Sequence, residues 1–357
     1  MESTSAVRPV SADAEAPSAA RFAAQASRCT PHLGANAALI AVAGLALAYQ
    51  LFGLPLLLRA AGGASLALWV SLLPVVLVVL ATPIHWGLIH EGIHGQLLAS
   101  RRANEAVARL LSISLAIPFD AVRFGHLMHH RFTREAFDRP DVDDARGPRW
   151  LRCMAWYARL LGGLYAAELC APLLAFVPAR MAQELVARGV GAHGAQGPIV
   201  QRLFSNHAAD PVRRRRARRD GLGALALYGF AFALYGKAWP VLLVTMYLRG
   251  LWLSLADNLP HYGVALDEPG RARDFRVPRG VGVLLMNHHL HRQHHLHPTL
   301  PWVALPALTR AEDAASVHAR IPYWHAALRQ FKGLQPGRGS VLTAAAEARG
   351  RQRTQTH

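Results

Sequence analysis

The sequence predicts an all-α membrane protein with four transmembrane helices in two hairpins and a helical cap on the cytoplasmic side. Its 357 residues are 52% hydrophobic yet carry a formal charge of +17, so apolar and basic residues must be segregated along the chain. A helix needs about 20 apolar residues to span a bilayer. Four stretches reach or approach that length: residues 37–58, 64–84, 222–235 and 240–255.

The first two stretches are predicted to form one hairpin, because only the short turn from Arg59 to Gly63 separates them. That turn carries a single positive charge, whereas Arg101, Arg102 and Arg109 follow the second stretch. Basic residues are retained on the cytoplasmic side of a membrane. Both ends of this hairpin are therefore expected to be cytoplasmic, which in a bacterium means the cytoplasmic face of the inner membrane.

The last two stretches are predicted to form a second hairpin with the same orientation. An arginine-rich run, from Val212 to Arg219, stands immediately before residue 222, and the turn at residues 236–239 is too short to hold a domain. A basic cluster beside a span is explained by anionic lipid more simply than by nucleic acid. The expected partner is therefore the membrane, and no nucleic-acid partner is expected.

Three further segments complete the predicted organisation. Residues 153–177 are apolar enough to span, but one crossing there would put the arginine run on the wrong side, so they are expected to lie along the interface or dip partway in. Residues 1–33 lack the apolar core of a signal peptide, and residues 333–357 have little to pack. Both are predicted to be disordered tails of one membrane domain, residues 34–332.

Histidine is the unusual residue of this chain. Thirteen of the nineteen histidines lie in four short regions, at the predicted cytoplasmic ends of the spans or just beyond them. Within three regions they recur at i, i+4 or at i, i+3 and i+4, which is one face of a helix. With the single histidine of the fourth region, the candidate metal ligands are His90, His94, His126, His129, His130, His261, His291, His294 and His295.

These nine imidazoles predict a site for two metal ions. Neutral imidazole binds zinc, copper and iron, and the three cysteines have no C-x-x-C spacing that would indicate a thiolate site. Nine ligands exceed the four of a tetrahedral zinc site. The other histidines of these regions are interpreted as hydrogen-bonded residues at the membrane interface: His85, His288, His289 and His297.

The histidine motifs resemble those of the membrane fatty-acid desaturase and hydroxylase superfamily, which includes the carotenoid ketolases. Its three histidine boxes are similar to "HEGIHG" at residues 90–95, "HLMHH" at 126–130 and "HRQHHLHP" at 291–298. The order, the spacing and the placement relative to the two hairpins all match, and the resemblance extends over residues 37–306.

This resemblance implies a mushroom-shaped helical fold with two iron ions that activate dioxygen against an unactivated carbon, most simply that of a fatty acyl chain. Acid–base side chains cannot cleave such a C–H bond, whereas a metal-bound oxidant can, so no catalytic residue apart from the ligands is expected. The chain has no cytochrome b5 "HPGG" signature and no cysteine pattern for an iron–sulfur module. A separate ferredoxin-like or similar electron donor is therefore expected.

The resemblance also implies supporting residues. Four acids after the second box are similar to the family's acidic motif and are expected to orient ligands or fix the fold: Asp138, Asp141, Asp143 and Asp144. Asp257 lies four residues before His261, where the family commonly has asparagine, and is expected to accept the ring N–H of His261. Trp86 and Trp302 are expected to line a narrow apolar tunnel.

Two alternatives remain open at this point. The sequence "HLHPTLPW" after the third box is equally similar to the carotenoid ketolases and hydroxylases, so oxygen insertion into a carotenoid or another lipid competes with acyl desaturation. A metal-binding transporter is the remote alternative, because zinc carriers also have histidine-rich loops. Those loops are usually of low complexity, whereas the spacing here is helical.

Overall fold

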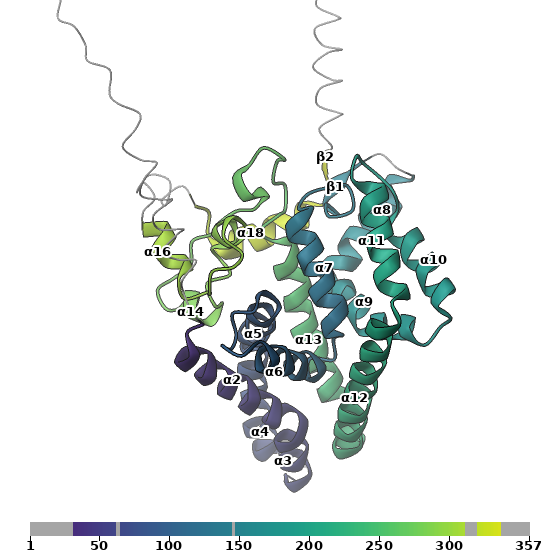
Figure 1. Cartoon of the computed structure of the whole chain (residues 1–357). Helices are drawn as coiled ribbons and strands as arrows, with labels where there is room; N and C mark the ends of the chain where they lie inside the picture. The colour runs from purple at the N-terminus through teal and green to yellow at the C-terminus, as the bar shows by residue number, and fades with distance from the viewer. Residues whose placement is uncertain (1–30, 62–64, 145–146, 311–319, 337–357) are drawn as a thin grey trace, which may run out of the picture.

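The computed structural model describes residues 31–61, 65–144, 147–310 and 320–336, which form a mostly helical protein (Figure 1). The one sheet assigned within these ranges pairs β1 (Val142–Asp143) with β2 (Gln335–Pro336) in parallel. The predicted all-α class is thereby confirmed. Most of the two predicted tails lies outside the described residues, but Leu334 is buried in a cluster with Trp156, so the folded part continues to residue 336.

The first predicted hairpin corresponds to two long apolar helical stretches. One comprises α2 (Leu33–Ala48), the π-helical η1 (Tyr49–Gly53) and α3 (Leu54–Ala60). The other comprises α4 (Ser65–Leu80) and α5 (Thr82–His94). Because α3 contacts α4 while α2 contacts α5, the two stretches run antiparallel. Residues 33–60 and 69–94 are both long and apolar enough to cross a membrane.

The helices after α5 hold its carboxyl-terminal turn in place. They are α6 (Arg101–Ser114) and α7 (Phe119–Arg131). Gly92 of α5 lets α6 approach closely, since a Cβ atom built on it would lie 2.3 Å from the Cβ of Ala108. Asn104 of α6 donates to the Gly92 carbonyl over 2.8 Å and accepts from the Leu97 amide over 2.9 Å. The turn that carries the first histidine box is therefore fixed by both packing and hydrogen bonds.

The second predicted hairpin is formed by α12 (Pro211–Tyr235) and α13 (Trp239–Asn258), joined by the short η4 (Gly236–Ala238). α12 and α13 contact each other. As expected from Pro260, α13 ends two residues before the proline. Many large apolar side chains on the helices of the two hairpins are exposed, as lipid-facing residues are, among them Leu45, Leu66, Trp69, Leu73 and Leu225.

The apolar segment between the hairpins is a broken helix. It consists of α8 (Arg149–Ala158), η2 (Arg159–Gly163), α9 (Leu164–Cys170) and η3 (Ala171–Ala175). It changes direction at Gly162, whose φ of 106° is readily adopted only by glycine. Residues 149–175 meet the length and hydropathy of a fourth candidate span, beside residues 33–60, 69–94 and the continuous stretch 211–258.

The arginine run before α12 is partly used inside the protein. Arg214 is buried and donates to the carbonyl oxygens of Leu174 and Ala175, over 2.9 and 3.0 Å, which satisfies the end of the broken helix. Arg216 pairs with Glu105 of α6 at 3.2 Å. The exposed arginines of this run, such as Arg215 and Arg219, are therefore the ones predicted to contact anionic lipid.

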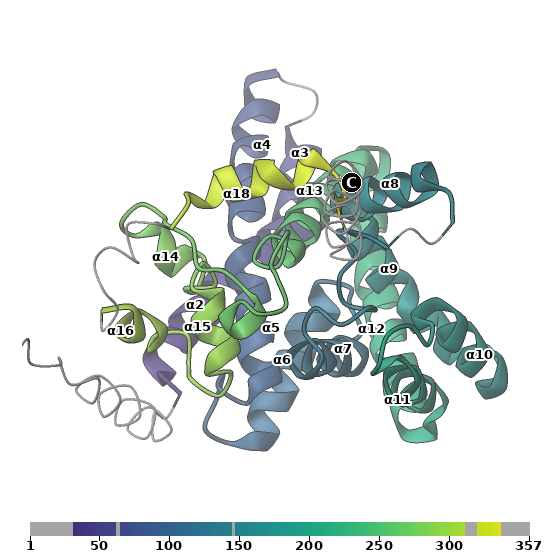
Figure 2. The same cartoon turned by 90° about the horizontal axis from the view of Figure 1, so that it is seen from above.

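The remaining helices lie on two sides of α5, α7 and α13. Figure 2 shows α8 to α11 on one side and α14, α15 and α16 on the other, and α15 itself carries three of the candidate ligands. Their bounds are α10 (Ala179–Val190), α11 (Gly197–Ala209), η5 (Pro269–Arg271), α14 (Val281–Leu284), α15 (His291–Leu296), α16 (Leu305–Arg310), α18 (Tyr323–Arg329) and η6 (Gln330–Lys332).

Candidate metal site

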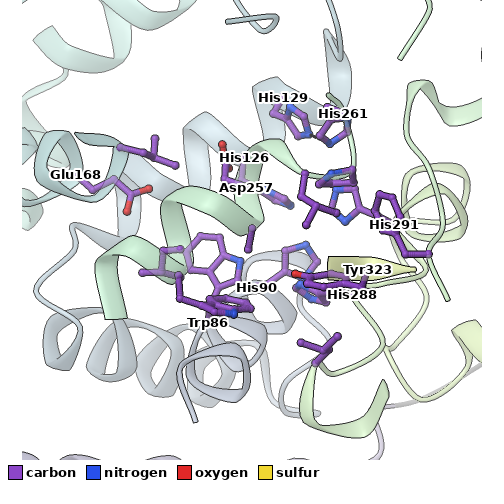
Figure 3. Close-up of a pocket in the computed structure, with 18 residues that line it drawn as sticks. Trp86, His90, His126, His129, Glu168, Asp257, His261, His288, His291 and Tyr323 are labelled. Atoms are coloured by element: carbon purple, nitrogen blue, oxygen red, sulfur yellow. Dashed lines mark hydrogen bonds between the residues drawn. The ribbon is translucent and has the colours of Figure 1, made fainter. Parts of the chain in front are cut away.

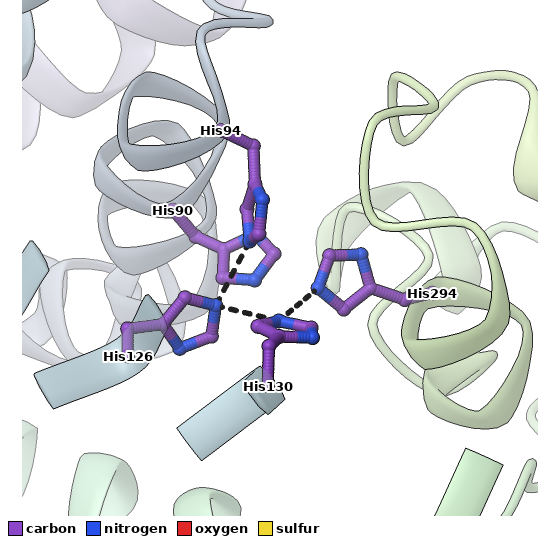
Figure 4. A group of neighbouring side chains, drawn as sticks. All are labelled: His90, His94, His126, His130 and His294. Atoms are coloured by element: carbon purple, nitrogen blue, oxygen red, sulfur yellow. Dashed lines mark hydrogen bonds between the residues drawn. The ribbon is translucent and has the colours of Figure 1, made fainter. Parts of the chain in front are cut away.

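All nine histidines predicted as ligands are brought together by the fold. They come from the last turn of α5, the second half of α7, the turn after α13, and α15. Their nitrogen atoms form two groups, and within each group the atoms lie within 4.8 Å of one another. The first group is His90, His94, His126, His130 and His294 (Figure 4), and the second group is His129, His261, His291 and His295.

The two groups divide the histidines of a single helix between them. In α7, His126 and His130 belong to the first group and His129 to the second. The reason is helical geometry: residues at i and i+4 are offset by about 40°, whereas neighbours are about 100° apart. In α15 the i, i+4 pair His291 and His295 joins the second group, and His294 points to the first.

The first group has the geometry of a set of ligands directed at one point. The Nε2 atom of His126 lies 2.9 Å from Nε2 of His94 and 3.0 Å from Nε2 of His130, which is in turn 3.0 Å from Nε2 of His294. His90 is buried, and neither of its ring nitrogens has a hydrogen-bond partner among the described residues. Buried polar atoms rarely stay unsatisfied, so His90 indicates a ligand in this group.

The second group converges in the same way. The Nε2 atom of His129 lies 3.1 Å from that of His261 and 3.2 Å from that of His295, which is also 3.2 Å from that of His291. The opposite nitrogens are held by acceptors. Nδ1 of His129 donates to the Asp138 carboxylate over 2.8 Å, and Nδ1 of His261 donates to the Arg271 carbonyl over 2.9 Å. Such bonds fix the tautomer that presents Nε2 to a metal.

The electrostatics keep these rings in the form that binds metal. Burial, and after it the neighbouring imidazoles, holds the pKa of His126, His291 and His294 well below the usual value, so the rings are neutral. His129 differs: burial lowers its pKa, but Asp138 raises it by more, and the net shift is upward. A more basic ring is a stronger ligand.

The nine imidazoles fit two first-row transition-metal ions, one with five and one with four protein ligands. Neither set resembles a closed tetrahedral zinc–thiolate site, because the two cysteines within the described ranges, Cys153 and Cys170, belong to neither group. Each set therefore suits an ion that prefers imidazole ligands, such as iron, copper or zinc.

A match to a family profile decides the family of the chain. The profile described as fatty acid desaturase matches residues 67–327, which include all nine histidines. The chain belongs to the fatty acid desaturase family. A curated relative is a protein named beta-carotene ketolase from Paracoccus sp. (strain N81106 / MBIC 01143), which is 24% identical over 234 residues, covering 63% of this chain and 74% of that protein. The predicted superfamily, with its carotenoid ketolases, is thereby confirmed.

One acidic residue near the site of this desaturase-family protein has a different partner from the one expected. Asp257 does not contact His261 but pairs with Arg159 at 2.9 Å, because the chain leaves the helix at Asn258 and turns His261 toward the Arg271 carbonyl. The residue that holds a ligand is Asp138. Asp141 instead fixes the fold, pairing with Arg134 and accepting the Gly263 amide over 2.8 Å.

Four other histidines were interpreted as hydrogen-bonded residues at the membrane interface, and the structure gives the surroundings of two of them. His85 is buried inside the helical bundle, where Nδ1 lies 2.7 Å from Nη2 of Arg249 and Nε2 lies 2.8 Å from the Leu111 carbonyl. The His288 ring lies 4.3 Å from that of His90, centroid to centroid, and its buried Nε2 has no partner among the described residues.

Two adjoining cavities lie beside the imidazoles. Figure 3 shows the inner cavity, of about 70 Å³, which has Trp86, His90, His126 and Tyr323 on its walls. The outer cavity measures about 400 Å³ and shares several of the same residues, including Trp86. Trp86 therefore lies on the wall, as expected. Trp302 does not line either cavity: it is buried in the core, and its indole N–H donates to Asn36 over 2.9 Å.

The cavities are less apolar than a simple tunnel for a hydrocarbon chain. Leucine and aromatic side chains such as Leu164 and Phe204 form part of the outer wall, but Glu168, Asp257 and Arg159 lie on it as well. Sequence reasoning did not single out Glu168, because it lies in an apolar helix remote from the histidine boxes. A substrate in this cavity meets a polar wall beside His126 and His129.

Proposed function

We propose that this protein is a membrane-bound, oxygen-dependent desaturase that removes hydrogen from a fatty acyl chain at a site holding two iron ions. The observation that carries the proposal is the convergence of nine imidazoles into two groups beside a cavity. Family membership supports the reaction class, oxidation by dioxygen, and makes a metal-binding transporter the weakest of the original alternatives.

The residues have distinct tasks in this proposal. The two imidazole groups hold the iron ions, which when bound supply the oxidant for the C–H bond. Asp138 and the Arg271 carbonyl keep His129 and His261 in the tautomer with Nε2 toward the ion. Trp86 and Leu164 position the apolar chain against His126. The buried rings exclude bulk water, which protects the oxidant from side reactions.

Oxygenation of a carotenoid is the second candidate, and two observations favour it. The curated relative is named a beta-carotene ketolase, and the outer cavity has Glu168 on its wall. A carboxyl group there offers a hydrogen bond to a hydroxyl or carbonyl product, which an alkene product does not need. The two candidates differ in the product: desaturation removes two hydrogens, and ketolation adds oxygen.

The first prediction concerns the metal and the product. The protein purified after expression in a bacterial host is expected to contain about two iron ions per chain, from the two imidazole groups. Mass spectrometry of lipids from aerated cells, with a carotenoid-producing host in parallel, should show a new acyl species lighter by two hydrogens. Oxygenated carotenoid in place of that species would select the second candidate, and an iron-free protein with unchanged lipids would reject both.

We also propose that the two hairpins open toward the cytoplasm and that the histidine site lies on that side. The distribution of arginine supports this orientation. The broken helix at residues 149–175 is proposed to lie along the interface or dip partway into the membrane, because its break and its carboxyl-terminal end are tied to the same end of the α12–α13 pair. Arg159 pairs with Asp257 near the end of α13, and Ala175 accepts from Arg214 near the start of α12.

The orientation leads to the second prediction. Alkaline phosphatase, which is active only outside the inner membrane, is expected to be active when fused after Lys237 and inactive when fused after Arg219 or His297. Lys237 lies in the turn between α12 and α13, at the far end of that pair. Phosphatase activity at Arg219 together with none at Lys237 would show that residues 149–175 cross the membrane, and the proposed orientation would be abandoned.

A further inference from the structure

A polar surface cavity, distinct from the proposed substrate cavity, reaches histidines of both groups. It measures about 500 Å³, and its walls include His130 of the first group and His295 of the second. The two rings are stacked, with centroids 4.3 Å apart and planes 28° apart. Both groups are therefore accessible from this surface through one pair of imidazoles.

Arginine dominates the surface around this opening. A second cavity, of about 450 Å³, shares Glu268 with the first, so the two adjoin. Together their walls contain six arginines and three acids, Glu135, Glu268 and Asp274. The arginine face is defined by these six residues: Arg131, Arg271, Arg273, Arg292, Arg320 and Arg329. Its excess of positive charge favours an acidic partner.

Short hydrogen bonds connect the arginine face to the second imidazole group. The Arg271 guanidinium donates to the Thr133 carbonyl over 2.8 Å, and the Thr133 hydroxyl donates to the His129 carbonyl over 2.6 Å. The same hydroxyl lies 3.4 Å from Nδ1 of His295. The Arg271 carbonyl accepts the ring N–H of His261. A protein docked on this face would be one residue away from ligands of the second group.

Resting on the proposed function, we propose that the arginine face is the docking surface of an acidic one-electron carrier protein. Removing two hydrogens from a substrate with dioxygen forms two waters and takes up two further electrons and two protons. Inserting one oxygen atom forms one water and takes up the same number. In either case the reduction of dioxygen takes four electrons, and the substrate supplies two of them. The carrier must therefore deliver the other two, in two one-electron steps, near the metal ligands.

The third prediction tests the docking surface. The iron-loaded protein in nanodiscs is supplied with an acidic [2Fe–2S] ferredoxin, its reductase and NADPH, and product is measured against ferredoxin concentration. Reversing two exposed charges, Arg131→Glu with Arg329→Glu, is expected to raise the KM for ferredoxin about tenfold or more, since charges at the edge of an interface govern association. The matched control is Arg188→Glu on α10, an exposed arginine beside Glu184, and it should leave that KM unchanged.

Two further measurements separate docking from chemistry. In one series a stoichiometric amount of dithionite replaces the carrier and reduces the iron-loaded protein without oxygen, and oxygen is added afterwards. Absence of product from this dithionite-driven turnover in the wild-type protein would reject the proposed function, not the surface. Normal dithionite-driven turnover with an unchanged KM for ferredoxin in the double variant would overturn the docking surface. In the wild-type protein, raising the salt concentration from about 20 to about 300 mM should slow the ferredoxin-driven rate and leave the dithionite-driven reaction unchanged. A ferredoxin-driven rate that does not respond to salt would equally overturn the docking surface.

Discussion

Replacing His294 or His261 with alanine is expected to abolish most product formation, by about 100-fold or more, and to lower bound iron from about two ions per chain to about one or fewer. His294 belongs to the five-imidazole group and His261 to the four-imidazole group, so the two variants test the two halves of the site. Each substitution removes a nitrogen that neighbouring rings cannot replace, because their Nε2 atoms already converge on the same point. Iron is measured by mass spectrometry of the purified protein and activity by product formation.

Two other histidines serve as controls for these variants. His325 is exposed on α18 and belongs to neither group, so His325→Ala should retain iron and activity. His85→Ala should retain iron but lower stability, by about 1–3 kcal/mol, because Nη2 of the buried Arg249 loses its acceptor, although Gln50 and Thr82 still accept from the other guanidinium nitrogens. Near-normal turnover with full iron in His294→Ala or His261→Ala would refute the shared site.

Eight of the nine histidines were predictable from the sequence by helical spacing, and His261, which lies beyond the end of α13, was added as a single residue. Residues at i and i+4 on α5, α7 and α15 must lie on one face of each helix, and the structure brings all of these imidazoles together. The division into two groups follows from the same geometry, because His129 and His130 are neighbours and must point about 100° apart. Treating the three histidines of α7 as one helical face left this division unnoticed.

The partners of the ligands were not predictable in the same way, because they depend on where the chain leaves a helix. Asp257 is four residues before His261, a distance that would bring the two together on a continuous helix. The helix ends at Asn258, however, and His261 turns to the Arg271 carbonyl instead. His288 is a second example: Met286 and Asn287 adopt positive φ angles of 45° and 55°, and this turn places the ring beside His90.

The broken helix between the hairpins shows a further limit of hydropathy. Residues 149–175 are as long and apolar as a span, and composition does not distinguish a crossing from a return. The proposal that these residues do not cross rests on contacts between distant residues: Arg214 with Ala175, and Arg159 with Asp257. Neither pair has a signature in local sequence, because both depend on how α12 and α13 pack.

Asp138→Asn is expected to weaken iron binding and turnover by about 10- to 100-fold, the usual effect of losing an acceptor behind a metal ligand. Asp138 receives Nδ1–H of His129 over 2.8 Å and the Arg134 amide over 3.0 Å. Burial raises the pKa of this carboxyl, but the His129 imidazole lowers it by more, so the group is ionised and makes the His129 ring more basic. Asparagine keeps the shape and an acceptor oxygen but loses the charge.

Asp257→Asn is the matched control for this change, because Asp257 lines the same outer cavity as Asp138. Its carboxylate is paired with Arg159 and not with a candidate ligand. Its iron affinity should stay within about twofold of the wild-type value, since surface ion pairs contribute little. Affinity is measured by competition with a chelator, and turnover is measured on the same preparations. Equal losses of iron affinity in the two variants would mean that any negative charge in the cavity supports iron binding. Unchanged affinity in Asp138→Asn would show that the carboxylate does not strengthen His129 as a ligand. A loss confined to Asp138→Asn assigns the effect to the hydrogen bond with His129.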